Sequence, residues 1–132
     1  MPNEPQKNNV LINSKYYKLI DKIKADIAKN GVTTNIIADL QLLREMVVAE
    51  NQPLLAKAIR LTFQHIEANE SFHIAIPDDE PIEGFEDVEK IETEINDVES
   101  LDYLLSNMGD ISNKMNVSDI RDFVNQLIEL VD

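Results

Sequence analysis

The sequence predicts an all-α fold, a five-helix bundle with one short extended segment and an acidic hinge loop. Three observations support this. Apolar residues recur at steps of three and four along most of the chain, capping residues precede these stretches, and only three glycines occur among 132 residues. Because a chain of this length fits one domain, we expect a disordered N-terminal tail over 1–12 and a single helical domain over 13–132, with an acidic connector at 77–84.

The first predicted helix begins after a capping pair at 13–14 and stops at Asn30 and Gly31. One helical face carries its apolar residues, which are Tyr16, Leu19, Ile20, Ile23 and Ile27. This face is expected to be buried against the rest of the bundle.

The second predicted helix is apolar over much of its circumference, and Thr33 or Thr34 can cap it. Its central stripe comprises Ile36, Leu40, Leu43 and Val47. Further apolar side chains flank the stripe on both sides: Ile37, Leu42, Met46 and Val48. We therefore expect this helix to lie centrally in the bundle or to offer one side to a partner.

A third helix is predicted from the turn at 51–53 to about Asn69, because proline is tolerated in a first turn, where its missing N–H would have no partner. Its buried side is expected to comprise Leu54, Leu55, Ala58, Ile59, Leu61, Thr62 and Ile66. With the second helix it would form an antiparallel hairpin that does not recur at a fixed period, so a repeat array is excluded. The alternation from Phe72 to Ile76 then predicts the extended segment.

The acidic half is predicted to contain the hinge at 77–84 and two more helices. Apolar residues recur from Phe85 to Met108, which predicts one long helix or two with Ser100 as the second cap, and we favour a kink there. After a polar loop, Ser118 is predicted to cap the last helix. Its apolar face comprises Ile120, Phe123, Val124, Leu127, Ile128 and Val131.

The charge of the chain is distributed unevenly. Residues 1–69 carry nine Lys or Arg and seven Asp or Glu, whereas residues 70–132 carry three and eighteen, and the formal net charge is −13. Phosphate backbones and anionic membranes repel such a chain, so we expect no nucleic acid and no membrane among its partners. The chain has no cysteine, no secretion signal and no apolar run of about 20 residues, which favours a cytoplasmic location.

The sequence contains no pattern for nucleotide-dependent or nucleophilic catalysis. Its glycines, at 31, 84 and 109, are too far apart for a dinucleotide or phosphate loop, and no Gly-x-Ser-x-Gly turn occurs. An EF-hand that starts at Asp79 would place Pro81 and Lys90 at ligand positions, so it is excluded as well. We expect no catalytic residue and no cofactor.

One local pattern offers a metal-binding alternative. Glu70 and His73 have the spacing by which di-iron bundles place a carboxylate and an imidazole on one side of a helix. His65 and Glu67 could add ligands if the chain folded back. Because the second motif of such sites is absent, we favour ordinary structural positions for these four residues and keep a metal-binding bundle protein or enzyme as the competing hypothesis.

The leading hypothesis is a non-enzymatic protein-interaction module that uses an acidic helical face or the apolar flank of the second helix. The run from Asp78 to Asp102 contains twelve carboxylates and a single lysine. We expect it to bind a basic protein partner, and a homo-oligomer is a further option. The residues expected to make this contact are Glu86, Glu89, Glu92 and Glu94.

The acidic run has three alternative interpretations. It can be a solvated face that aids solubility, or a mimic of nucleic acid that occupies a basic binding protein. It can also face the basic half internally, through the lysines on one side of the first helix, Lys15, Lys18 and Lys22.

Overall fold

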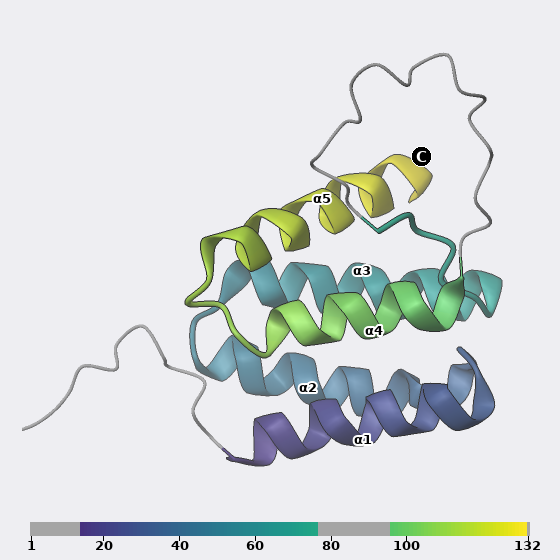
Figure 1. The fold of residues 1–132 in the computed structure, drawn as a ribbon, viewed down its shortest axis with the longest axis horizontal. Helices are drawn as coiled ribbons and strands as arrows, with labels where there is room; N and C mark the ends of the chain where they lie inside the picture. Colours follow the sequence, from purple (N-terminus) through teal and green to yellow (C-terminus); the bar gives the residue numbers. More distant parts are fainter. Residues whose placement is uncertain (1–13, 77–95, 132) are drawn as a thin grey trace, which may run out of the picture.

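The computed structural model describes residues 14–76 and 96–131, and in these ranges the chain is a bundle of helices without strands (Figure 1). Five α-helices and one 3₁₀ turn follow in the order α1 Ser14–Asn30, η2 Thr34–Ile36, α2 Ile37–Ala49, α3 Pro53–Asn69, α4 Asp97–Met108 and α5 Lys114–Val131. The all-α prediction is confirmed. The expected tail at 1–12 and the acidic connector at 77–84 lie outside the described residues.

The five α-helices form a closed circuit around one core. α2 packs on α3, α3 on α5 and α5 on α4, while α1 contacts both α2 and α4 (Figure 1). The hydroxyl of Tyr16 in α1 donates a hydrogen bond to the carbonyl oxygen of Met108 at the end of α4 (2.8 Å). Burial raises the pKa of this hydroxyl, so the tyrosine stays neutral and joins the two halves of the chain.

The predicted boundaries of the first and third helices are confirmed, whereas the second α-helix begins later than predicted, at Ile37, after a 3₁₀ turn. α1 ends at Asn30, and Gly31 follows with a φ of 81°, a left-handed conformation that glycine adopts without a Cβ clash. The Thr33 hydroxyl accepts a hydrogen bond from the backbone N–H of Asn35 (3.2 Å), so Thr33 caps the 3₁₀ turn that leads into α2. All stripe positions predicted for α1 and α2 are buried.

The predicted cap and kink at Ser100 are wrong. Ser100 lies buried inside α4, where its hydroxyl donates to the carbonyl oxygen of Ile74 (2.5 Å). The cap of α4 is Asn96, whose side chain accepts from the backbone N–H of Glu99 (3.0 Å). The helix expected before it, over 85–95, lies outside the described residues.

The predicted start of the last helix at Ser118 is also wrong. α5 begins at Lys114, and the side chain of Asn113 accepts hydrogen bonds from the backbone N–H groups of Met115 (2.8 Å) and Asn116 (3.3 Å). Asparagine and serine are comparable capping residues, so the sequence offered two candidate starts for this helix, at Asn113 and at Ser118. The structure uses the first of them.

The segment that follows α3 lies against the bundle, as predicted. Phe72 and Ile74 are buried, whereas His73 and Ala75 are exposed. The ring of Phe72 stacks on that of Phe123 in α5, with the ring centres 6.0 Å apart. Alternate side chains thus enter the core, although the segment forms no strand.

Side chains of α4 and α5 replace the missing strand partner. The Gln126 amide bonds both backbone groups of Ala75, accepting from its N–H (3.3 Å) and donating to its carbonyl oxygen (2.9 Å). Asp97 accepts from the N–H of Phe72 (3.1 Å), and Ser100 adds the bond to Ile74 described above. We call residues 72–76 and these three partners the clasp.

Candidate functional site

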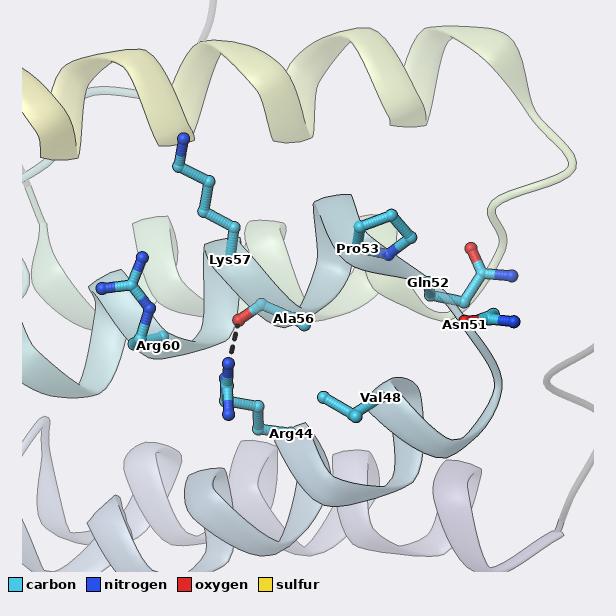
Figure 2. Close-up of a pocket in the computed structure, with 8 residues that line it drawn as sticks. All are labelled: Arg44, Val48, Asn51, Gln52, Pro53, Ala56, Lys57 and Arg60. Carbon is cyan, nitrogen blue, oxygen red and sulfur yellow. Dashed lines mark hydrogen bonds between the residues drawn. The ribbon is translucent and has the colours of Figure 1, made fainter.

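A pocket of about 450 Å³ lies beside the turn between α2 and α3 (Figure 2). Three cationic side chains, two amides and three apolar residues line it: Arg44, Val48, Asn51, Gln52, Pro53, Ala56, Lys57 and Arg60. We call it the hairpin pocket. Both helices contribute cations, so neither helix alone would form this site.

Helical spacing and a tight turn build the hairpin pocket. Arg44 and Val48 are four residues apart on α2, and Lys57 and Arg60 are three apart on α3, so each pair shares one side of its helix. Asn51 adopts a left-handed conformation with a φ of 58°, which asparagine tolerates better than most residues. The chain reverses at this point, and the two pairs come to face the same pocket.

The Arg44 guanidinium is fixed across the hairpin. Its Nε–H donates to the carbonyl oxygen of Ala56 at 3.2 Å, the dashed line in Figure 2. Arginine has five N–H donors, and within the described residues the other four have no hydrogen-bond partner. One donor therefore holds the side chain in place while its terminal N–H groups stay available to a ligand.

The three cations of the hairpin pocket have no counter-ion among residues 14–76 and 96–131. The ion pairs described there involve other groups, namely Lys22 with Asp39, Lys24 with Asp102, and His73 with Asp97. Glu45 and Glu50 are close in sequence, yet neither takes part in a described ion pair with a cation of the pocket. The pocket thus gathers three cations without a described counter-ion in a chain whose net charge is −13.

α2 exposes two large apolar side chains, Leu42 (46% exposed) and Val48 (50%). At about 100° per residue they lie roughly 120° apart around the helix axis. Leu42 follows Asp39 by three residues and shares its side, where Asp39 binds Lys22 of α1 (2.6 Å). The exposed apolar residues of α2 therefore lie on two different sides of the helix and do not form one continuous flank. Of the two, Val48 lines the hairpin pocket.

The four glutamates predicted to bind a partner, Glu86, Glu89, Glu92 and Glu94, lie outside the described residues. Three carboxylates of the acidic run are described, all on α4: Asp97, Glu99 and Asp102. Asp97 belongs to the clasp, and Asp102 lies 3.8 Å from the Nζ of Lys24 in α1.

The contact of Lys24 with Asp102 tests the interpretation that the basic half of the chain pairs with the acidic half. Lys24 is not one of the three lysines predicted to face the acidic half, and Lys22 instead binds Asp39 within the basic half. The pair of Lys24 and Asp102 is partly exposed, and such pairs contribute only about 0–1 kcal/mol. Within the described residues, internal pairing therefore neutralises little of the acidic half.

The residues of the metal hypothesis form no described ligand set. α3 ends at Asn69, and Glu70 has a left-handed φ of 52°, so Glu70 and His73 do not share the helical spacing that a di-iron motif requires. His73 instead lies 3.2 Å from Asp97. Among the residues that the structure describes, no group of three or more His, Cys, Asp or Glu side chains could hold a metal ion.

His65 is a packing residue at the edge of the clasp. Its ring meets that of Phe72 edge-on, with centres 6.0 Å apart, and its Nε2 is buried without a hydrogen-bond partner among the described residues. Burial lowers the pKa of His65, the charge of nearby His73 lowers it further, and Asp97 offsets part of the effect. The neutral form is therefore favoured.

Sequence reasoning missed Arg44, Lys57 and Arg60. The spacing of Lys57 and Arg60 was visible, but Arg44 is distant in sequence and joins them only through the reversal at Asn51. Helical wheels of the two helices, combined with the predicted antiparallel hairpin, could have indicated that these three cations lie on the same side of the hairpin.

Comparisons with protein-family models, with curated proteins and with solved structures found no match for this chain. No helix in the described ranges combines the length and the apolar character needed to span a bilayer. The function is therefore argued from the residues of the chain itself.

Proposed function

We propose that the protein is a non-enzymatic interaction module that docks a protein partner on the hairpin pocket. The observation that carries this proposal is the set of three cations without a described counter-ion, placed beside the half-exposed Val48. A charged cluster that only stabilised the fold would be expected to have paired groups, whereas these three groups have no ion-pair partner in the described part of the chain. A cytoplasmic location remains part of the proposal.

The physical argument follows from the pocket's composition. Interfaces combine an apolar contact with a polar rim, and arginine is enriched in them. The Arg44 side chain is already ordered by its bond to Ala56, so less conformational entropy is lost when it binds a ligand. These features support docking more than catalysis, since the lining of the pocket contains no Ser, Thr, Cys, Tyr, His, Asp or Glu side chain.

The test uses the full chain as bait in the native lysate. Lys57→Gln with Arg60→Gln removes two cations that have no described partner. The matched control, Lys18→Gln with Lys29→Gln, removes two exposed cations from α1 and changes the net charge equally. We expect a partner of the unaltered chain to be lost with the pocket variant and retained with the control; equal capture by both variants would rule out the pocket.

The acidic face remains the second candidate surface for the same function. Replacing Glu86, Glu89, Glu92 and Glu94 with glutamine removes its charge with little change in shape. If this variant loses the partner while the pocket variant keeps it, the module binds through its acidic face. Tightly bound metal in elemental analysis, lost with His65→Ala or His73→Ala, would instead support the metal hypothesis.

A further inference from the structure

We infer that the hairpin pocket binds an acidic peptide segment in which several carboxylates accompany one apolar side chain. This inference rests on the proposed function, because it names the chemistry of the partner that docks there. It depends on the arrangement of the three cations, on the position of Val48 and on the charge of the whole chain.

The cations are spread around the hairpin pocket and do not meet at one point. In Figure 2, the guanidinium groups of Arg44 and Arg60 lie at different places beside α3, and Lys57 extends away from both. A single compact anion is poorly matched to this arrangement, whereas carboxylates spaced along a peptide can reach separate cations. The free terminal N–H groups of an arginine suit the two oxygens of a carboxylate.

Val48 adds an apolar contact to this charged surface. It lies in Figure 2 between Arg44 and the turn that carries Asn51 and Gln52. The amides of those two residues can donate to and accept from the backbone of an extended peptide. One apolar side chain of the ligand can therefore cover Val48 while its backbone and carboxylates bind the polar groups around it.

The net charge of the chain disfavours long polyanions more than a short acidic segment. At about 0.15 M salt the screening length is about 8 Å, so a short ligand is affected mainly by the charges of the pocket. α4, which carries Asp97, Glu99 and Asp102, packs mainly on α1 and α5. A nucleic acid would extend beyond the pocket towards the acidic half of the chain, and is therefore an outcome of the test.

The probe is a fluorescently labelled synthetic peptide of glutamates around one central leucine, and its binding to the full chain is followed by anisotropy. We expect Lys57→Gln with Arg60→Gln to weaken binding about fivefold, from the usual strength of exposed ion pairs, and Lys18→Gln with Lys29→Gln to leave it nearly unchanged. Val48→Thr should weaken it about threefold, because a hydroxyl replaces one methyl group that the bound peptide would cover, whereas Leu42→Thr should not.

Three comparison probes decide the chemistry: the same peptide with glutamine for glutamate, a peptide with one phosphoserine, and a single-stranded oligonucleotide. The acidic peptide should bind more tightly than all three. No binding of the acidic peptide, equal weakening by the α1 control, or tighter binding of either phosphate probe would overturn the inference.

The outcomes separate this inference from the proposed function. If a partner from the lysate depends on Lys57 and Arg60 while the acidic peptide does not bind, the docking function stands and the peptide chemistry is wrong. If the partner is captured equally well by the unaltered chain and by Lys57→Gln with Arg60→Gln, the docking function at this pocket is wrong as well.

Discussion

The clasp and the hairpin pocket use polar side chains in opposite ways. In the clasp, Asp97, Ser100 and Gln126 each bind the backbone of one short segment, and Phe72 beneath them is fully buried. In the hairpin pocket, Lys57 and Arg60 have no described partner. Satisfied polar groups over a buried ring stabilise a fold, whereas charged groups without partners add little to stability and remain available for binding.

The largest expected effect is on the core beneath the clasp. Phe123→Ala should lower the free energy of unfolding by about 3–5 kcal/mol, because the ring is fully buried and stacks on Phe72. Urea denaturation of the variant measures this change. Leu130→Ala, at an exposed position of the same helix, is the control and should change stability by less than about 0.5 kcal/mol. A small loss with Phe123→Ala would show that this face does not support the clasp.

The clasp itself is tested with Ser100→Ala. The change should cost about 1–3 kcal/mol, because the carbonyl oxygen of the buried Ile74 loses its hydrogen-bond donor. The same denaturation experiment on Ser106→Ala, an exposed serine of α4, provides the comparison and should give a smaller loss. Equal losses in the two variants would mean that the clasp bond contributes no more than a surface contact.

His65, whose ring packs on Phe72 at the edge of the clasp, should also make stability depend on pH. The pKa of His65 in the folded chain lies below the ordinary value. At a pH between the folded and the unfolded pKa, the unfolded chain therefore binds more protons than the folded chain. Stability should therefore be full above the unfolded pKa, near 6.5, and decrease as the pH falls below it. Denaturation at several pH values between about 7.5 and 5.5 measures how steeply the free energy of unfolding changes with pH. This dependence should be weaker in His65→Gln. A gain in stability on acidification would contradict this assignment.

The smallest effect is expected at the hairpin pocket. Lys57→Gln with Arg60→Gln should change the free energy of unfolding by less than about 0.5 kcal/mol per site, because neither side chain loses a described partner. Circular dichroism melts of this variant beside Lys18→Gln with Lys29→Gln provide the check. A clear destabilisation confined to the pocket variant would give these cations a structural role and remove the contrast with the clasp.

The local signals in the sequence were sufficient for α1, α2 and α3. Each of these helices combines a regular apolar stripe with a turn residue that suits its end, such as Gly31 with its positive φ and Pro53 in the first turn of α3. The stripes of α1 and α2 were predicted correctly, because the helical period depends only on neighbours along the chain. In α3, Leu54 was expected to be buried but is only partly so, and the buried Ala56 was not predicted. The apolar face of α5 was also largely right, although Ile128 is 42% exposed.

Tertiary contacts decided what the sequence left open. Ser100 and Asn96 are both good capping residues, and Ser100 became an interior residue because Ile74, distant in sequence, brings it a carbonyl oxygen. The hairpin pocket depends in the same way on the packing of α2 against α3, which places Arg44 near Lys57 and Arg60. Periodicity and caps are local and can be deduced from the order of residues, whereas a shared hydrogen bond or a cluster of charges exists only after distant segments have met.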